Sequence, residues 1–326
     1  YAIGRTNTTS IQSTLQTPFR ERTNRAVALR ESGINLTTTA SYDHEAVRAL
    51  VADIAAYVTR DPVDAQIQSF DYATRTFSFT ESQPGVTLDQ DLLYERVTAA
   101  LDRWESGVTV TVDPIVTEPA VTKDELVASF GLVAAYTTET TNDSNRNTNI
   151  DLACQAINGT ALMPGETFSF NQATGQRTTE KGYKSAGAIA AGQSIEEVGG
   201  GICQVSSTLF NAVARANLEI VSRSPHAWPS TYVNIGEDAT VNWPNLDFQF
   251  KNNTKSPIFI ITYYKNRRMS AEIWGMSLGE GVTIDLQSTI IKTIDPPSEV
   301  KYELNTDLPY GTEKTTVKAR TGYVVE

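Results

Sequence analysis

The stretch GGGICQVSSTLFNA, residues 199–212, decides how this chain is to be understood. Consecutive glycines are entropically costly, so they mark a backbone that bends sharply or approaches another group closely. These three lead directly into a cysteine, in a chain that has only two cysteines. The apolar residues that follow, among them Leu209 and Val213, recur with helical spacing. The stretch therefore predicts a bend followed by a helix whose first turn carries Cys203.

A cysteine in the first turn of a helix is a candidate nucleophile. The unpaired N–H groups and partial positive charge of a helix N-terminus favour the thiolate over the thiol. Glycines before it leave no Cβ to obstruct a substrate carbonyl that approaches the sulfur. The N–H groups of Cys203 and of the glycines are candidate oxyanion donors. The candidate oxyanion or substrate-binding residues are Gly199, Gly200, Gly201, Gln204, Ser206 and Ser207; for Ser207 a structural role is an equal alternative.

A thiolate nucleophile also needs a base, and the chain contains two histidines. His44 lies in the first turn of a predicted helix, where a solvated or capping role is expected. His226 lies in SRSPHAWPSTYVN, before a predicted strand, and completes the order cysteine then histidine known from cysteine acyl-transfer enzymes. Asp238 or Asn234 is the candidate orienting acceptor for its second ring nitrogen. The alternatives are a surface histidine and a solvated turn aspartate.

Other interpretations of the cysteines remain open at this stage. A cysteine is among the most frequently buried residue types, and most buried cysteines are inert. For Cys154, on a helical face with Ile150 and Ile157, core packing is the expected role. A disulfide between Cys154 and Cys203 would silence the nucleophile.

Length, composition and charge restrict the class of protein. A chain of 326 residues suits two domains, and 40% hydrophobic with 20% charged residues is typical of a globular protein. A net charge of −11 argues against nucleic-acid or anionic-membrane partners. Two distant histidines supply no ligand cluster, so we expect no metal and no cofactor. Few cysteines and histidines, with many threonines and asparagines, are typical of a bacterial extracytoplasmic protein. Because the sequence starts at Tyr1 rather than at methionine, we also expect a signal or anchor segment to precede the given chain.

The order of predicted elements indicates an α+β fold in three parts. Residues 1–124 are expected to form a compact α+β domain, with helices at 43–60 and 88–104, strands around 65–80 and a strand at VTVTV, 108–112. Residues 125–275 are expected to form a mixed catalytic domain of helices and short strands. Its predicted strands include TYVNI, 231–235. Residues 276–326 are expected to form a small β appendage.

Several of these motifs together resemble one known family. NRNTNIDLACQAINGTALMPGETFSFN, GYKSAGAI, GGGICQVSSTLFNA and LEIVSRSPH are similar to a VanW domain over roughly residues 130–275. Residues 40–120 resemble the peptidoglycan-binding domain that accompanies VanW domains. His226 matches the histidine that follows the LEIV segment in this family, although its SPHAWP context departs from the commoner HSxPVxY form.

The resemblance implies L,D-transpeptidation, which forms 3–3 peptide cross-links in peptidoglycan. It agrees with Cys203 as nucleophile, His226 as base and Asp238 as the residue that orients it, with stem peptides and glycan strands as partners. The SHGCxR-type motif of the better-known L,D-transpeptidases is absent. The alternative is a non-catalytic cell-wall protein in which the glycine loop only recognises a stem peptide.

Overall fold

The computed structural model describes residues 19–33, 41–104, 106–190 and 193–326. The chain divides into two compact units. The first comprises the described residues up to Asp64 together with Ser82–Val121, and the second comprises Ala65–Glu81 together with Thr122–Glu326. Both units combine helices with antiparallel strands, which confirms the α+β prediction.

The first unit is built on two helices whose starts are capped by aspartates. Helix α3 (His44–Val58) begins after Asp43, whose carboxylate accepts the N–H groups of the first turn. Helix α4 (Gln90–Asp102) begins in the same way after Asp89. The unit also contains α2 (Phe19–Ser32), β3 (Gly85–Thr87) and β4 (Ile115–Thr117), with β3 and β4 antiparallel.

The prediction of a strand at residues 108–112 is wrong. This segment has no strand geometry, and β3 instead pairs with residues 115–117. A strand depends on a hydrogen-bonding partner as well as on alternation, and Val108 is left 47% exposed.

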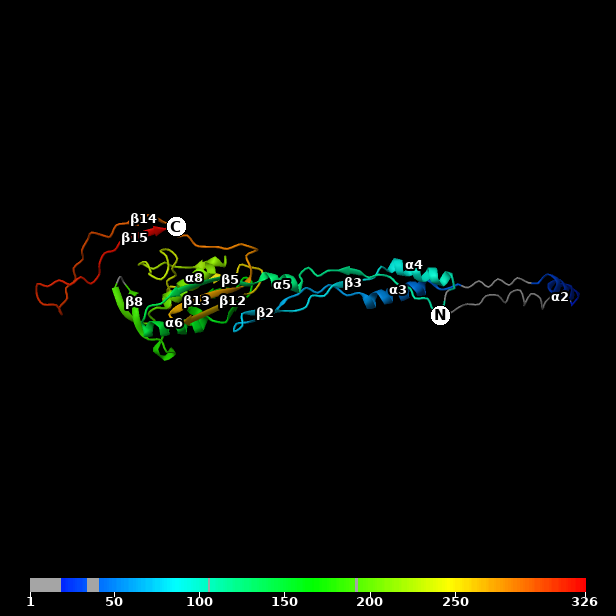
Figure 1. Ribbon diagram of the computed structural model, residues 1–326, viewed down its shortest axis with the longest axis horizontal. Coiled ribbons are helices and arrows are strands. Elements are labelled where there is room, and N and C mark those ends of the chain that lie inside the picture. The colour runs from blue at the N-terminus through cyan, green and yellow to red at the C-terminus, as the bar shows by residue number, and fades with distance from the viewer. Residues whose placement is uncertain (1–18, 34–40, 105, 191–192) are drawn as a thin grey trace. The chain divides into compact units, whose positions relative to one another are not determined.

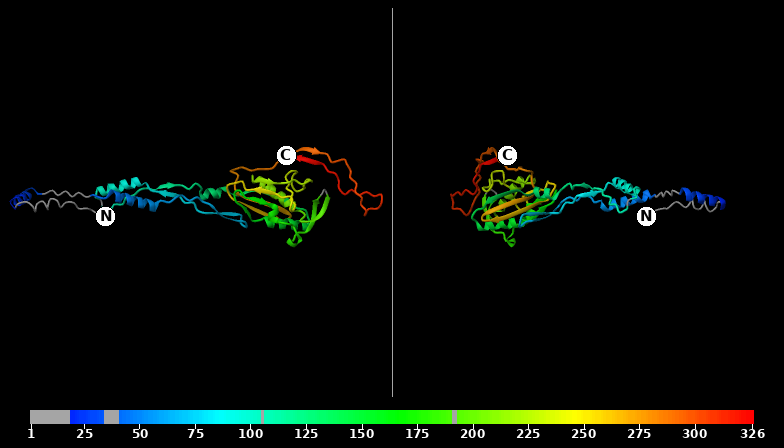
Figure 2. Two further views of the ribbon diagram at one scale, coloured as in Figure 1. Left: turned by 180° about the vertical axis from the view of Figure 1, so that it is seen from behind. Right: turned by 45° about the vertical axis from the view of Figure 1, so that its right-hand side comes forward.

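A four-stranded antiparallel sheet forms the centre of the second unit (Figure 1). Two helices pack on each other and on one face of this sheet, where Ile260, Met269 and Ile273 are completely buried. Figure 2 shows the sheet from two further sides. In spatial order the strands are β5 (Phe130–Glu139), β13 (Arg268–Met276), β12 (Ile258–Lys265) and β6 (Thr160–Leu162), and the helices are α6 (Ser144–Ile157) and α8 (Ile202–Arg215).

A hairpin from much earlier in the chain packs on the opposite face of the sheet. It consists of β1 (Ile67–Asp71) and β2 (Thr76–Phe79). The ring of Phe70 lies 4.8 Å from that of Phe259, and Arg75 binds the Glu272 carboxylate at 2.8 Å. We expected this hairpin within the N-terminal domain, whereas the structure packs it on the sheet of the second unit.

Short elements complete the second unit and lead to the site. The hairpin β8 (Ser185–Ala190) and β9 (Gln193–Val198) runs directly into the glycines that precede α8. The segment expected as a strand at 231–235 is irregular. The remaining elements are α5 (Lys123–Ser129), β7 (Thr167–Ser169), α7 (Phe170–Thr174), a 3₁₀ turn at Thr179–Lys181, β10 (Glu219–Ser222), β11 (Gln249–Lys251), β14 (Ile290–Ile294) and β15 (Gly322–Val325).

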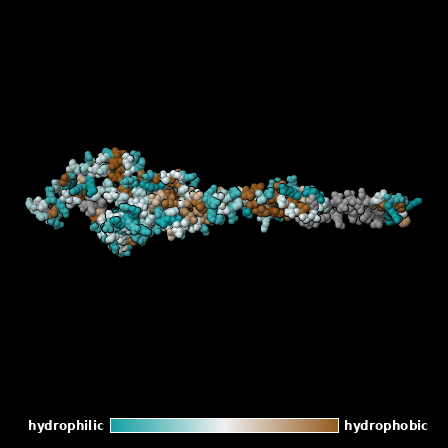
Figure 3. Space-filling model, viewed as in Figure 1, coloured by the Kyte–Doolittle hydropathy of each residue, from teal (hydrophilic) through white to brown (hydrophobic). Residues whose placement is uncertain are grey.

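The β14–β15 hairpin carries apolar side chains on its surface. A brown patch lies over this pair of strands in the space-filling view (Figure 3). The exposed aliphatic residues of the two strands are Ile290, Ile291, Ile294 and Val324. Among the described residues, no helix has the length and apolar character needed to cross a membrane.

Candidate active site

Each of the three glycines before α8 has its own structural reason. Gly199 and Gly201 have φ angles of 91° and 102°, in the left-handed region that side chains other than glycine rarely adopt. A Cβ on Gly200 would lie 2.3 Å from the carbonyl oxygen of Ala186 in β8. The triplet therefore allows the chain to turn from β9 into α8 while pressed against the hairpin.

Two of these glycines also make room for arginine side chains. A Cβ on Gly201 would lie 2.6 Å from Cγ of Arg146, and one on Gly199 would lie 3.0 Å from Cβ of Arg177. The glycines were expected to clear a path for a substrate carbonyl. In the structure, the space beside these two glycines is occupied by groups of the protein itself.

Cys203 is the second residue of α8 and is partly exposed, with its thiol donating to the carbonyl of Val241 at 3.4 Å. The N–H groups of Gly201 and Cys203 find no acceptor among the described residues, as expected at a helix start. The N–H groups around them are used within the loop: those of Gly199, Gly200, Ile202 and Gln204 all donate to backbone carbonyls.

His226 lies between a carboxylate and the cysteine. Its Nδ1 hydrogen bonds to Asp238, and its backbone N–H donates to the same carboxylate oxygen at 2.6 Å. Burial alone would lower the pKa of His226, but hydrogen bonds to Asp238 and Cys203, with the charges of both groups, raise it to about 9. Since Nδ1 is engaged by Asp238, Nε2 is the ring nitrogen left to face the sulfur.

Asp238 is held as an anion. Burial works against its charge, yet hydrogen bonds from the His226 ring and backbone and the positive charges of His226 and Arg223 leave its pKa below the ordinary value. Arg223 donates to its other carboxylate oxygen at 3.2 Å and to its backbone carbonyl at 2.6 Å. At neutral pH the pair is therefore carboxylate and imidazolium.

The polar residues in the next turn of α8 are buried and bonded within the protein. Gln204 donates to Thr138 and to the carbonyl of Glu139. Ser206 donates to the carbonyl of Ala239 at 2.5 Å, and Ser207 accepts the N–H of Ala239 at 2.9 Å. These side chains tie α8 to β5 and to the loop that carries Asp238, so their place in the structure is to hold the site together.

The second cysteine belongs to the core. Cys154 on α6 is completely buried, and this burial raises the pKa of its thiol far above the ordinary range. Both cysteines are free, so no disulfide silences Cys203.

Sequence reasoning missed several residues around the sulfur. Arg146, Arg177 and Tyr232 all interact electrostatically with Cys203, and burial together with the cysteine charge raises the pKa of Tyr232. Asn149 on α6 donates to the carbonyls of Gly200 and Lys184 at 2.9 Å and so anchors the glycine turn. The polar start of α6 in NRNTN was the signal for Arg146 and Asn149. No spacing along the chain relates Arg177 or Tyr232 to Cys203.

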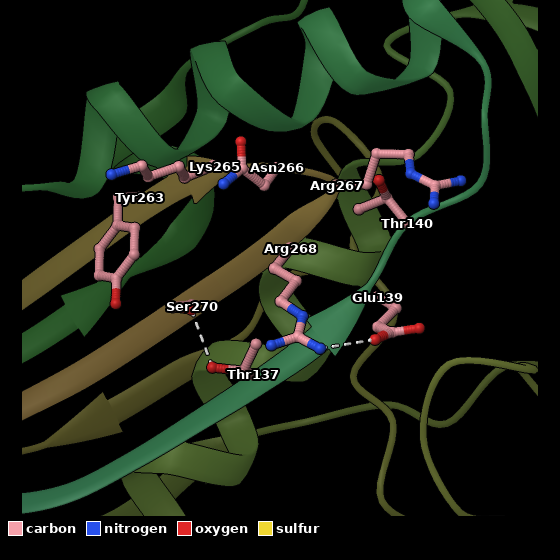
Figure 4. Close-up of a pocket in the computed structure, with 9 residues that line it drawn as sticks. All are labelled: Thr137, Glu139, Thr140, Tyr263, Lys265, Asn266, Arg267, Arg268 and Ser270. Atoms are coloured by element: carbon pink, nitrogen blue, oxygen red, sulfur yellow. Dashed lines mark hydrogen bonds and ion pairs between the residues drawn. The ribbon is translucent and has the colours of Figure 1, made fainter.

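A cavity of about 660 Å³ lies elsewhere, between β5 and the turn that joins β12 to β13 (Figure 4). Arg268 and Glu139 form an ion pair there at 3.0 Å. The cavity contains neither Cys203 nor His226, so we do not connect it with the chemistry. Its lining residues are Thr137, Glu139, Thr140, Tyr263, Lys265, Asn266, Arg267, Arg268 and Ser270. Within the described part of the chain, no group of three or more His, Cys, Asp or Glu residues is placed to hold a metal ion.

Comparison with known proteins identifies the family. Residues 145–274 match the family model described as "VanW like protein". A relative from Bacillus subtilis, "Uncharacterized protein YoaR", is 32% identical over 299 residues, which cover 91% of this chain and 94% of the relative. The chain belongs to the VanW family. The resemblance inferred from the motifs is thereby confirmed.

Two further comparisons concern single parts of this VanW family protein. The "Vancomycin B-type resistance protein VanW" of Enterococcus faecalis is 33% identical over 115 residues, covering 34% of this chain and 42% of that protein. Residues 8–109 match a model described as "Putative peptidoglycan binding domain". No solved structure matches the chain. Together the matches make it a protein of the cell wall with peptidoglycan as a partner.

Proposed function

We propose that this protein is a cysteine L,D-transpeptidase that forms 3–3 cross-links between peptidoglycan stem peptides. The observation that carries the proposal is the position of His226, which is bonded to a buried carboxylate on one side and interacts with Cys203 on the other. Asp238, His226 and Cys203 thus stand in the order of orienter, base and nucleophile used in acyl transfer.

In the first half-reaction, the Cys203 thiolate attacks the carbonyl carbon of the third residue of a donor tetrapeptide. The amide C–N bond breaks, a thioester forms, and the His226 imidazolium gives its proton to the departing amine of the terminal D-amino acid. The N–H groups of Gly201 and Cys203, which find no acceptor within the described part of the chain, would stabilise the oxyanion of the tetrahedral intermediate.

In the second half-reaction, the neutral side-chain amine of an acceptor stem peptide attacks the thioester. Neutral His226 takes a proton from this amine, the new amide forms, and the thiolate leaves. The starting pair of thiolate and imidazolium is restored without any other reactant. Water competes with the amine and would yield a free tripeptide carboxylate.

A non-catalytic wall-binding protein is the second candidate, and the match of residues 8–109 to a peptidoglycan-binding model favours it. In either case we place the protein on the outer side of the membrane, where its polymeric partner lies. The candidates differ because a binding protein needs no reactive thiolate.

Incubation of the purified protein with disaccharide tetrapeptides distinguishes the transpeptidase from the binding protein. We expect mass spectrometry to detect cross-linked dimers that have lost one terminal D-amino acid. Cys203→Ala should reduce their yield by at least about 1000-fold, and Cys154→Ala, the matched control, should not. Product of equal yield from Cys203→Ala would contradict the assignment of the nucleophile, and no product from wild-type protein would favour the binding role.

A further inference from the structure

Arg146 and Arg177, beside Cys203, form no direct ion pair with an acidic side chain in the described part of the chain, although Asp143 acts on Arg146 through its charge. Arg146 and Arg177 are partly buried, and the described residues contain no ion pair for either of them. Arg146 donates to the Gln204 side-chain oxygen and Arg177 to that of Asn171, both at 2.8 Å. Each positive charge is therefore held by a neutral amide, in a protein whose net charge is −11.

The two amides are themselves fixed in orientation. The Gln204 NH₂ group donates to Thr138 and to the backbone of Glu139, and the Asn171 NH₂ group donates to the carbonyl of Leu246. Their oxygens must consequently point at the arginines. Glycines at positions 199 and 201 leave the space that the arginine stems occupy. The stems of both arginines are thus positioned before any ligand arrives, so that only the end of the side chain has to turn.

Arg177 has hydrogen-bonding capacity that the protein leaves unused. Its Nη1 is buried and has no partner within the described residues. Asp247 acts on it only through its charge, because the Asp247 oxygens accept from Ser169, Gln249 and the Asn171 backbone. A buried cationic donor without an acceptor is costly. Since the side chain as a whole remains partly exposed, rotation of its end can bring Nη1 to an incoming anion.

We propose that Arg177, supported by Arg146, binds the free C-terminal carboxylate of the donor stem peptide. The proposal rests on the transpeptidase function proposed above and names how that site selects its donor. The carboxylate of the leaving residue is three bonds from the carbonyl carbon that Cys203 attacks, so it lies near any group that flanks the sulfur. The planar guanidinium fork matches a carboxylate. Binding there places the last peptide bond of the donor, and no internal bond, at the thiolate.

The test compares a tetrapeptide donor with the same donor ending in a carboxamide. The rate of thioester formation is followed by intact-protein mass spectrometry. We expect wild-type protein to prefer the acid by about 100-fold, the size of a lost charged hydrogen-bond pair. In Arg177→Gln this preference should disappear, because the variant reacts more slowly with the acid and at an unchanged rate with the carboxamide. In Arg146→Gln the preference should fall by about 10-fold. Arg268→Gln, at an arginine outside the site, is the control that should retain the full preference.

Other outcomes overturn the proposal. If Arg177→Gln slows both donors equally and also slows alkylation of Cys203 by iodoacetamide, the arginine only stabilises the thiolate. A wild-type protein that accepts both donors equally contradicts carboxylate recognition. If Arg177→Gln fails to fold, the comparison of the acid and carboxamide donors is made with Arg146→Gln. An unchanged preference for the acid in this variant then contradicts the proposal.

A separate measurement distinguishes failure of this proposal from failure of the proposed function. If wild-type protein forms no thioester with any donor, calorimetry with Cys203→Ala still compares binding of the two tetrapeptides. Tighter binding of the acid that disappears with Arg177→Gln in this background supports the carboxylate site. Equal binding of the acid and the carboxamide rules it out.

Discussion

The two cysteines of this protein lie on neighbouring helices that pack on the same face of one sheet, yet their surroundings are opposite. Cys154 lies near the end of α6, completely buried among apolar side chains. Cys203 lies in the first turn of α8, partly exposed and close to His226, Arg146 and Arg177. Both are free thiols, so the difference between them comes only from position and neighbours.

The comparison shows what a helix contributes to reactivity. The end of α6 places Cys154 in the apolar core, where burial disfavours the charged thiolate and raises the pKa of the thiol. The start of α8 leaves Cys203 partly exposed, beside N–H groups that find no acceptor within the described chain and beside the positive charges of Arg146 and Arg177. The position of Cys203 at a helix start depends here on the three glycines, which allow the chain to turn from β9 into α8 against the β8–β9 hairpin.

The largest expected difference is in alkylation. Iodoacetamide should label Cys203 at least about 1000-fold faster than Cys154 in folded protein at neutral pH, because only a thiolate that is accessible reacts. Peptide mapping after timed quenching measures both rates in one sample. Comparable labelling of the two sites would remove the contrast.

The next effect tests the histidine. His226→Ala should lower transpeptidation by about 100-fold, because the proton of the leaving amine loses its donor. It should also raise the pH at which Cys203 is alkylated, because the imidazolium no longer stabilises the thiolate. The control is His44→Ala in the first unit, which should change neither quantity. Identical alkylation profiles for wild type and His226→Ala would exclude His226 from the mechanism.

A third effect concerns pH and Asp238. The folded pKa of His226, about 9, exceeds its ordinary value of 6.5. The imidazolium therefore stabilises the fold fully below pH 6.5, and this contribution is lost as the pH rises through 9. The shift corresponds to a loss on the order of 3 kcal/mol in the free energy of unfolding. Asp238→Asn removes the main hydrogen-bond partner, so its loss over the same interval should be smaller.

Urea unfolding at pH 6, 7.5 and 9 measures this difference. The same variant should move the alkaline limit of activity to lower pH, since His226 loses its proton earlier. Parallel pH dependence of stability in wild type and Asp238→Asn would contradict the carboxylate–imidazolium pair.

The smallest effect is that of Cys154→Ala. Removing a buried sulfur should lower the free energy of unfolding by about 1–2 kcal/mol through lost packing, with kcat for transpeptidation unchanged. Thermal denaturation and the turnover assay measure the two quantities independently. A loss of activity as large as that of Cys203→Ala would make Cys154 part of the site.

Local patterns predicted much of this fold. The stripe around Val47 and Val51, with Asp43 before it, correctly predicted α3. The start of α8 at the glycines followed from the properties of glycine alone. The strand at 108–112 was predicted wrongly because strand formation depends on a distant partner. The hairpin at 67–79 was predicted as strands, but its packing on Phe259 and Glu272 depends on contacts nearly 200 residues away along the chain.

The residues of the candidate site were likewise predicted only in part. Scarcity of histidine and the glycine motif drew attention to Cys203 and His226, and a short sequence distance linked His226 to Asp238. Arg146 and Arg177 approach Cys203 from separate elements that only the folded sheet brings together. Arginine is too common on protein surfaces for its position in the sequence to indicate such a role.

The hairpin at residues 67–79 restricts how the two units can be separated or exchanged. Since it belongs to the second unit while the residues on both sides of it belong to the first, the chain passes between the units at 64–65, 81–82 and 121–122. No single cut can separate them: a fragment starting at residue 122 would leave Phe259 and Ile261 without the ring of Phe70 that covers them. Exchange of either unit by recombination would need junctions at all three crossings at once, so the two units are expected to be inherited together.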